Sequence, residues 1–202
     1  MEKVLSKKIK IYIAWVVAFF VIIILQKVTP LKNREDLNLP VYIAFQILFL
    51  VYCLKNHKDL VEEKKGTKRT KIIVCSILFL FIMIRLFERI WIRVNYPTSI
   101  TKTNITTFYV LKWFGIFFIS SFCEEILFKK ILYKKLLKPH MKEIVAIVSV
   151  AIIFSLWHYN ASVITYVFTI CYQVITLLMY EKYPNIYLYV MVHFFWNFSI
   201  LI

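Results

Sequence analysis

Residues 72–92 read IIVCSILFLFIMIRLFERIWI, and only Ser76, Arg85, Glu88 and Arg89 interrupt the apolar run. About 20 mostly apolar residues are enough for an α-helix to cross the hydrocarbon core of a bilayer. The run does not alternate between apolar and polar residues, as the strands of a membrane β-barrel do. The stretch therefore predicts a membrane-spanning helix.

Six further apolar stretches flank this one, at about residues 11–25, 40–54, 108–137, 142–158, 162–180 and 185–202. Lipid offers no partner to a backbone N–H or C=O group, so long apolar spans satisfy these groups as α-helices. The first stretch follows four lysines, as in a signal peptide, but no small-residue cleavage site comes after it, so we expect it to be retained. The sequence predicts an all-α, polytopic membrane helical bundle with about seven transmembrane helices.

The composition agrees with a membrane protein. Hydrophobic residues make up 61% of the 202 residues and charged residues 18%, which is too apolar for an ordinary soluble domain or a disordered chain. Only 2 Gly and 5 Pro are present, which disfavours a Gly-rich phosphate loop and a turn-rich β-sandwich. The 4 cysteines lie in or at the ends of apolar stretches without CxxC spacing, so we interpret them as packing residues.

The net charge of +15 indicates that the basic loops contact an anionic partner. On so apolar a chain, basic residues favour the anionic face of a bilayer over nucleic acid. With the N-terminus in the cytoplasm, 18 of the 26 Lys and Arg residues fall in cytoplasmic loops, 5 fall outside and the rest lie in helices. This distribution follows the positive-inside rule and predicts a cytoplasmic N-terminus.

Polar residues inside the predicted spans are candidates for function, because an ionisable group there costs about 2.5–3.5 kcal/mol on insertion scales. The first group lies in SSFCEEILFK, residues 120–129. Glu125 and Lys129 have i,i+4 spacing and can form an ion pair, whereas Glu124 points about 100° away and can face another helix. The alternative is that both glutamates are solvated beside the lysines at the membrane interface.

The second and third groups each contain a histidine. FSLWH, residues 154–158, ends with His158, and HFFWN, residues 193–197, places His193 and Asn197 on one face of a helix. Either histidine could instead serve only as a hydrogen-bonding partner between helices. If the fourth helix runs unbroken to residue 137, Glu124 and His158 lie roughly 21 and 24 Å from the turn that joins their helices, and so at matching depth.

Four such side chains around one cavity would suit hydrolysis. A carboxylate and an imidazole, here Glu124 and His158, can polarise one water for attack on a carbonyl. A second imidazole and an amide, here His193 and Asn197, can donate to the developing oxyanion. Equally, His158 and His193 together with Glu124 or Glu125 form a His2Glu ligand set that suits zinc with an open position for water. The residues leave both alternatives open.

The three groups, in this order, resemble the motifs EExxxR, FxxxH and HxxxN/D of the CPBP family of intramembrane endopeptidases. This family includes CAAX-type prenyl-protein proteases and bacterial Abi, bacteriocin-processing and self-immunity proteins. The resemblance covers about residues 108–202 and divides the chain into helices 1–3 with a basic loop, residues 1–107, and a catalytic core, residues 108–202. One residue departs from the pattern: Lys129 stands where Arg is usual, which keeps the charge and loses the planar fork.

The resemblance implies roles for single residues. Glu124 and His158 would activate water, His193 and Asn197 would stabilise the oxyanion, and Glu125 would be a supporting acid.

The resemblance also implies an enzyme of the bacterial cytoplasmic membrane that cuts a membrane-associated peptide or protein, as a CAAX-type or a bacteriocin self-immunity protease. The competing hypothesis is a non-catalytic immunity or peptide-binding protein that keeps the family fold. A transporter is disfavoured because no internal repeat is visible. Arg85, Glu88 and Arg89 are expected to pair with one another, or else to contact a substrate carboxylate. No oligomeric state is predicted.

Overall fold

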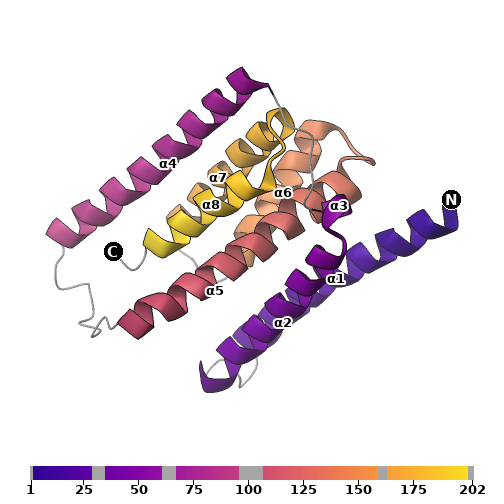
Figure 1. Ribbon diagram of the computed structural model, residues 1–202, viewed down its shortest axis with the longest axis horizontal. Helices are drawn as coiled ribbons and strands as arrows, with labels where there is room; N and C mark the ends of the chain where they lie inside the picture. Colours follow the sequence, from indigo (N-terminus) through magenta and orange to yellow (C-terminus); the bar gives the residue numbers. More distant parts are fainter. Residues whose placement is uncertain (1, 29–34, 61–66, 96–106, 159–162, 200–202) are drawn as a thin grey trace. The chain divides into compact units, whose positions relative to one another are not determined.

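Helices account for all regular secondary structure in the described part of the chain (Figure 1). The computed structural model describes residues 2–28, 35–60, 67–95, 107–158 and 163–199. Its elements are α1 (Glu2–Val28), α2 (Glu35–Lys55), α3 (His57–Leu60), α4 (Lys68–Asn95), α5 (Thr107–Glu125), η3 (Ile126–Leu137), α6 (Glu143–Trp157), α7 (Val163–Lys182) and α8 (Ile186–Phe198). The predicted all-α fold is confirmed.

Each of the seven predicted stretches falls on a helix, and several helices begin earlier than the apolar run does. α1 begins at Glu2 and α4 at Lys68, within basic flanks whose lysines are good helix formers. Among the described residues, Lys68–Phe87 is the segment long and apolar enough to cross a membrane, with a mean hydropathy of 2.3. Shorter apolar helices are Leu39–Lys55, Glu143–Trp157 and Ile186–Phe198. The number of seven spans stays a prediction.

The chain forms two compact units that interleave along the sequence. The first consists of residues 1–62 and 126–181, and the second of residues 63–125 and 182–202. The first unit therefore contains α1, α2, α3, η3, α6 and α7, and the second contains α4, α5 and α8. The division at residue 107 follows the motifs and stays a prediction.

Aromatic side chains form the core of the first unit. Trp157 of α6 contacts Phe19 of α1 and Phe128 of η3, with ring centroids 5.1 and 5.8 Å apart. Phe128 also meets Phe154 of α6 edge-on at 5.0 Å. Aromatic pairs of this kind add to the stabilisation that burial provides. They hold α6, which carries the second motif, against α1 and η3.

The helix that carries the first motif does not keep one winding. We predicted a regular helix over residues 108–137, but α5 ends at Glu125 and η3 continues as a π-helix to Leu137. The amide of Lys138 donates to the carbonyl of Tyr133, five residues earlier, as π-winding requires. A π-helix advances less per residue than an α-helix, so the predicted depth of 21 Å does not hold.

A charged cluster closes the far end of η3. The ammonium of Lys138 forms ion pairs with Glu181 of α7 and, at 3.1 Å, with Glu143 of α6. Burial lowers the pKa of Lys138, but the hydrogen bonds and charges of both carboxylates outweigh burial and leave this pKa above its ordinary value. The cation is therefore kept at neutral pH, where it joins three helix ends of the first unit.

Candidate active site

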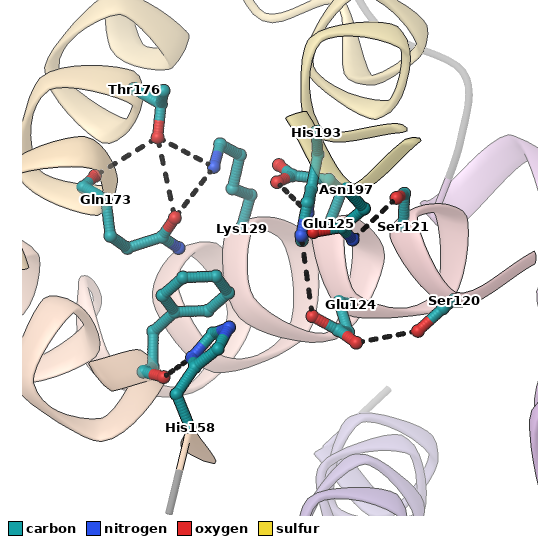
Figure 2. Close-up of polar contacts among 11 residues, drawn as sticks. Ser120, Ser121, Glu124, Glu125, Lys129, His158, Gln173, Thr176, His193 and Asn197 are labelled. Carbon is teal, nitrogen blue, oxygen red and sulfur yellow. Dashed lines mark hydrogen bonds and ion pairs between the residues drawn. The ribbon is translucent and has the colours of Figure 1, made fainter. Parts of the chain in front are cut away.

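The candidate site is built on two antiparallel helices of the second unit, α5 and α8 (Figure 2). Oε1 of Glu125 lies 2.9 Å from Nδ1 of His193, and Nδ2 of Asn197 donates to Oγ of Ser121 at 3.4 Å. Ser121 and Glu125 are four residues apart on α5, and His193 and Asn197 are four apart on α8. A step of four residues towards the C-terminus of α5 thus corresponds to a step of four residues towards the N-terminus of α8. Both pairs therefore link the two helices along the same line of contact.

A second, aromatic set of contacts keeps the same register. Phe114 of α5 contacts Phe194 and Phe198 of α8, with centroids 4.9 and 5.8 Å apart. Phe118, one turn further along α5, meets Phe194 at 5.8 Å. These pairs fix how α5 lies on α8, and they place apolar surface beside the polar pairs.

Glu124, the residue before Glu125 on α5, faces the other ring nitrogen of His193, Nε2. Its Oε1 accepts a hydrogen bond of 2.8 Å from Oγ of Ser120, and its Oε2 lies 3.7 Å from Nε2 of His193. A separation of 3.7 Å is longer than a hydrogen bond. Glu124 is 6% exposed and His193 is 3% exposed, so both groups are held away from bulk water.

The imidazole of His193 therefore lies between two carboxylates. The contact with Glu125 fixes the ring through Nδ1 and turns Nε2 towards Glu124. Fixing one ring nitrogen decides which nitrogen is presented for chemistry. The structure thus brings together four of the predicted site residues: Glu124, Glu125, His193 and Asn197.

His158, the fifth predicted residue, belongs to the first unit. It follows the last residue of α6, where its Nδ1 lies 3.1 Å from the carbonyl oxygen of Phe154 and its ring meets the ring of that residue at 5.0 Å. These contacts fix the orientation of the imidazole on its own helix. Its place beside Glu124 stays a prediction from the sequence.

Lys129 is fully buried in the first unit and bonds to α7. Its ammonium donates to Oε1 of Gln173 at 3.2 Å and to Oγ1 of Thr176 at 3.0 Å (Figure 2). It also lies 6.0 Å from the ring of Tyr172. The ion pair of Lys129 with Glu125 stays a prediction.

Four of these polar residues were not assigned a role from the sequence: Ser120, Ser121, Gln173 and Thr176. The serines carry a usable signal, because they precede the two glutamates by one helical turn. Gln173 and Thr176 have i,i+3 spacing in an otherwise apolar stretch, which also places them on one face. No pattern in the sequence identifies Lys129 as their partner.

Arg85 of α4 lies beside this site in the second unit. Its guanidinium carbon is 4.8 Å from the centre of the Trp196 ring, one residue before Asn197. The expected partners Glu88 and Arg89 have side chains outside the described residues. A cation over an indole face is a favourable contact, and here it joins α4 to α8.

The predicted zinc ligands can be tested against the distances within the second unit. Two ligands at 2.0–2.1 Å from a tetrahedral zinc ion lie about 3.4 Å apart. Oε2 of Glu124 and Nε2 of His193, 3.7 Å apart, are compatible with two such positions. Among the described residues, no group of three His, Cys, Asp or Glu side chains is placed to hold a metal ion.

Comparison with known proteins identifies the part of the chain that carries these residues. Residues 106–199 match the family model described as Rce1-like, type II CAAX prenyl endopeptidase. The match covers all three motifs and confirms the resemblance inferred from them. No curated protein and no solved structure matches the chain.

Proposed function

Because residues 106–199 match the Rce1-like, type II CAAX prenyl endopeptidase family model, we propose that this chain hydrolyses a peptide bond in a membrane-delivered peptide or protein. The observation that carries the proposal is the buried imidazole of His193 between the carboxylates of Glu124 and Glu125. These groups supply a proton acceptor and a donor at one place. No Ser or Cys nucleophile is needed for such chemistry.

In the proposed reaction, Glu124 is the general base. It takes a proton from water while the water oxygen attacks the scissile carbonyl, and the carbonyl electron pair moves onto oxygen. His158 would help to polarise the same water. When the tetrahedral intermediate collapses, the C–N bond breaks and Glu124 returns the proton to the leaving amine. Water is consumed, and a carboxylic acid and an amine are released, which become a carboxylate and an ammonium ion at neutral pH.

His193 and Asn197 would stabilise the intermediate as hydrogen-bond donors. When both ring nitrogens of His193 carry protons, Nδ1 donates to Glu125 and Nε2 can donate to the oxyanion. Asn197 has two N–H donors, of which one goes to Ser121 and the second suits the oxyanion. The phenylalanines between α5 and α8 place apolar surface beside these donors.

The substrate class follows from the family and from the apolar chain. We propose a lipid-modified, CAAX-type peptide as the substrate and a bacteriocin self-immunity role as the more specialised alternative. The enzyme would lie in the bacterial cytoplasmic membrane with its N-terminus in the cytoplasm. The excess of Lys and Arg in the loops on that side supports this orientation.

We expect the purified chain in liposomes to cleave a prenylated peptide and to release a shorter product that mass spectrometry identifies. The same peptide without its lipid should be cut at least tenfold more slowly, because it partitions poorly into the bilayer. Binding of the prenylated peptide without any product would instead support a peptide-binding or immunity protein. Cleavage of both peptides at equal rates would contradict the proposed lipid dependence.

We also expect cleavage to continue after treatment with a zinc chelator, because the proposed steps use protein groups only. The measurements are the rate before and after dialysis against the chelator and the zinc content of the purified protein. A rate that falls with chelation and returns on adding zinc would contradict the glutamate mechanism. It would assign Glu124, His158 and His193 as ligands of a zinc ion that supplies an activated water.

A further inference from the structure

Two adjacent serines precede the glutamate pair by one turn of α5. The hydroxyl of Ser120 donates to Oε1 of Glu124 at 2.8 Å, and the hydroxyl of Ser121 accepts from Nδ2 of Asn197 at 3.4 Å (Figure 2). Both serines are buried. Neither belongs to the three motifs.

A serine inside a helix commonly bonds back to the carbonyl of the residue four positions earlier. Ser120 donates its hydroxyl proton to a carboxylate four residues ahead. We propose that Ser120 and Ser121 are positioning residues, Ser120 for the carboxylate of Glu124 and Ser121 for the amide of Asn197. The proposal rests on the proposed hydrolysis for its effect on rate, whereas the two hydrogen bonds can be tested without any substrate.

Ser120 controls how closely Glu124 approaches His193. A Glu side chain has three rotatable bonds, and a carboxylate attracts an imidazole that can donate to it. The hydrogen bond to Oε1 holds the carboxylate so that Oε2 stays 3.7 Å from Nε2, beyond hydrogen-bond length. Without the Ser120 donor, the carboxylate can rotate to bond Nε2 directly. The base and the oxyanion donor would then engage each other rather than the water and the substrate.

Ser121 positions a residue of the other helix, Asn197 of α8. Its oxygen accepts one of the two N–H groups of Asn197, which fixes the rotation of the amide. With this rotation fixed, the second N–H keeps one direction. A preorganised donor of this kind contributes more to an oxyanion site than one that must first turn into place.

The kinetic test compares four variants by kcat and KM in liposomes. Ser120→Ala and Ser121→Ala should each lower kcat about tenfold or more with KM changed less than twofold, because the ground-state contacts of the substrate stay the same. Ser120→Thr keeps the hydroxyl and should restore kcat to within about threefold of the wild type. Ser155→Ala is the matched control, because Ser155 is a buried serine that bonds the Tyr166 carbonyl in the first unit. It should keep the wild-type kcat.

Additivity separates positioning from a general loss of stability. In an Asn197→Ala background, Ser121→Ala should cause no further loss, because the amide that it positions is gone. A further tenfold loss in that background would overturn the role of Ser121. If Ser120→Ala fails to insert into the membrane, Ser120→Cys replaces it, because a thiol is a weak donor of similar size.

An infrared measurement tests Ser120 independently of activity. The carboxylate band of Glu124 is the band that Glu124→Gln removes from the difference spectrum. Ser120→Ala should shift this band, and Ser121→Ala and Ser155→Ala should leave it in place. If Ser120→Ala shifts the band but the wild-type protein cleaves no substrate, the positioning role of Ser120 is supported and the proposed proteolysis is rejected. An unshifted band together with a wild-type kcat in Ser120→Ala would overturn the positioning role.

Discussion

Glu124→Gln should lower the cleavage rate by about 10³-fold or more, because a neutral amide cannot accept the proton of the attacking water. The exchange keeps the shape of the side chain and the acceptor that Ser120 bonds. We therefore expect the variant to insert into membranes and to bind substrate with an unchanged KM. Initial rates on a prenylated peptide in liposomes measure the effect.

A second glutamate provides the control for this substitution. Glu143 is exposed, lies at the start of α6 and pairs with Lys138. Glu143→Gln removes the same charge at the end of α6 opposite to the second motif and should keep the wild-type rate. A Glu124→Gln rate within tenfold of the wild type would show that another group activates the water. Substrate binding without cleavage by the wild type would point to a non-catalytic immunity or peptide-binding protein.

The Glu and His–Asn motifs could be predicted because short-range spacing encodes them. Glu124 and Glu125 point in different directions on any α-helix, and His193 and Asn197 share a face on any α-helix. Both expectations hold in the structure: Glu125 contacts Nδ1 of His193, and Glu124 faces Nε2 of the same ring. Which nitrogen meets which carboxylate depends on the register of α5 against α8. The aromatic contacts between these helices set that register, and it is not visible in either motif alone.

The change from α5 to η3 could not be predicted in the same way. The residues from Ile126 to Tyr133 are all buried, so no exposed face marks the helical period in this stretch. Periodicity identifies a helix by its contrast between apolar and polar faces, but Lys129 and Lys130 are buried here together with the apolar residues, so polarity does not mark an exposed face. In the first unit η3 packs against α1, α3 and α6.

Lys129 illustrates how a departure from a family motif can match its own surroundings. The planar guanidinium of an arginine suits a single carboxylate that it can bind with two parallel bonds. An ammonium carries three donors that diverge, and Lys129 directs them to two separate acceptors, Gln173 and Thr176. Both acceptors are neutral and belong to α7. The lysine at this position therefore anchors η3 to α7, whether or not it also pairs with Glu125.

His158→Ala should lower the cleavage rate about 10²-fold or more while the protein still inserts and binds substrate. The reason is chemical: a carboxylate and an imidazole that share one water remove its proton more effectively than either group alone. His158 ends α6, and its contacts with Phe154 already orient the ring. Added imidazole should restore part of the rate to His158→Ala, because a free base can enter the space that the side chain leaves.

His140 supplies the matched control for His158→Ala. It lies exposed in the loop between η3 and α6, so His140→Ala should cleave at the wild-type rate. A His158→Ala rate close to the wild type would assign water activation to Glu124 without an imidazole from α6. In that case the first unit would serve to anchor the protein in the membrane and to bind the substrate. The two helices α5 and α8 would contain all of the catalytic residues. Loss of cleavage in His158→Ala but not His140→Ala would instead require α6 to bring its histidine to the water that Glu124 holds.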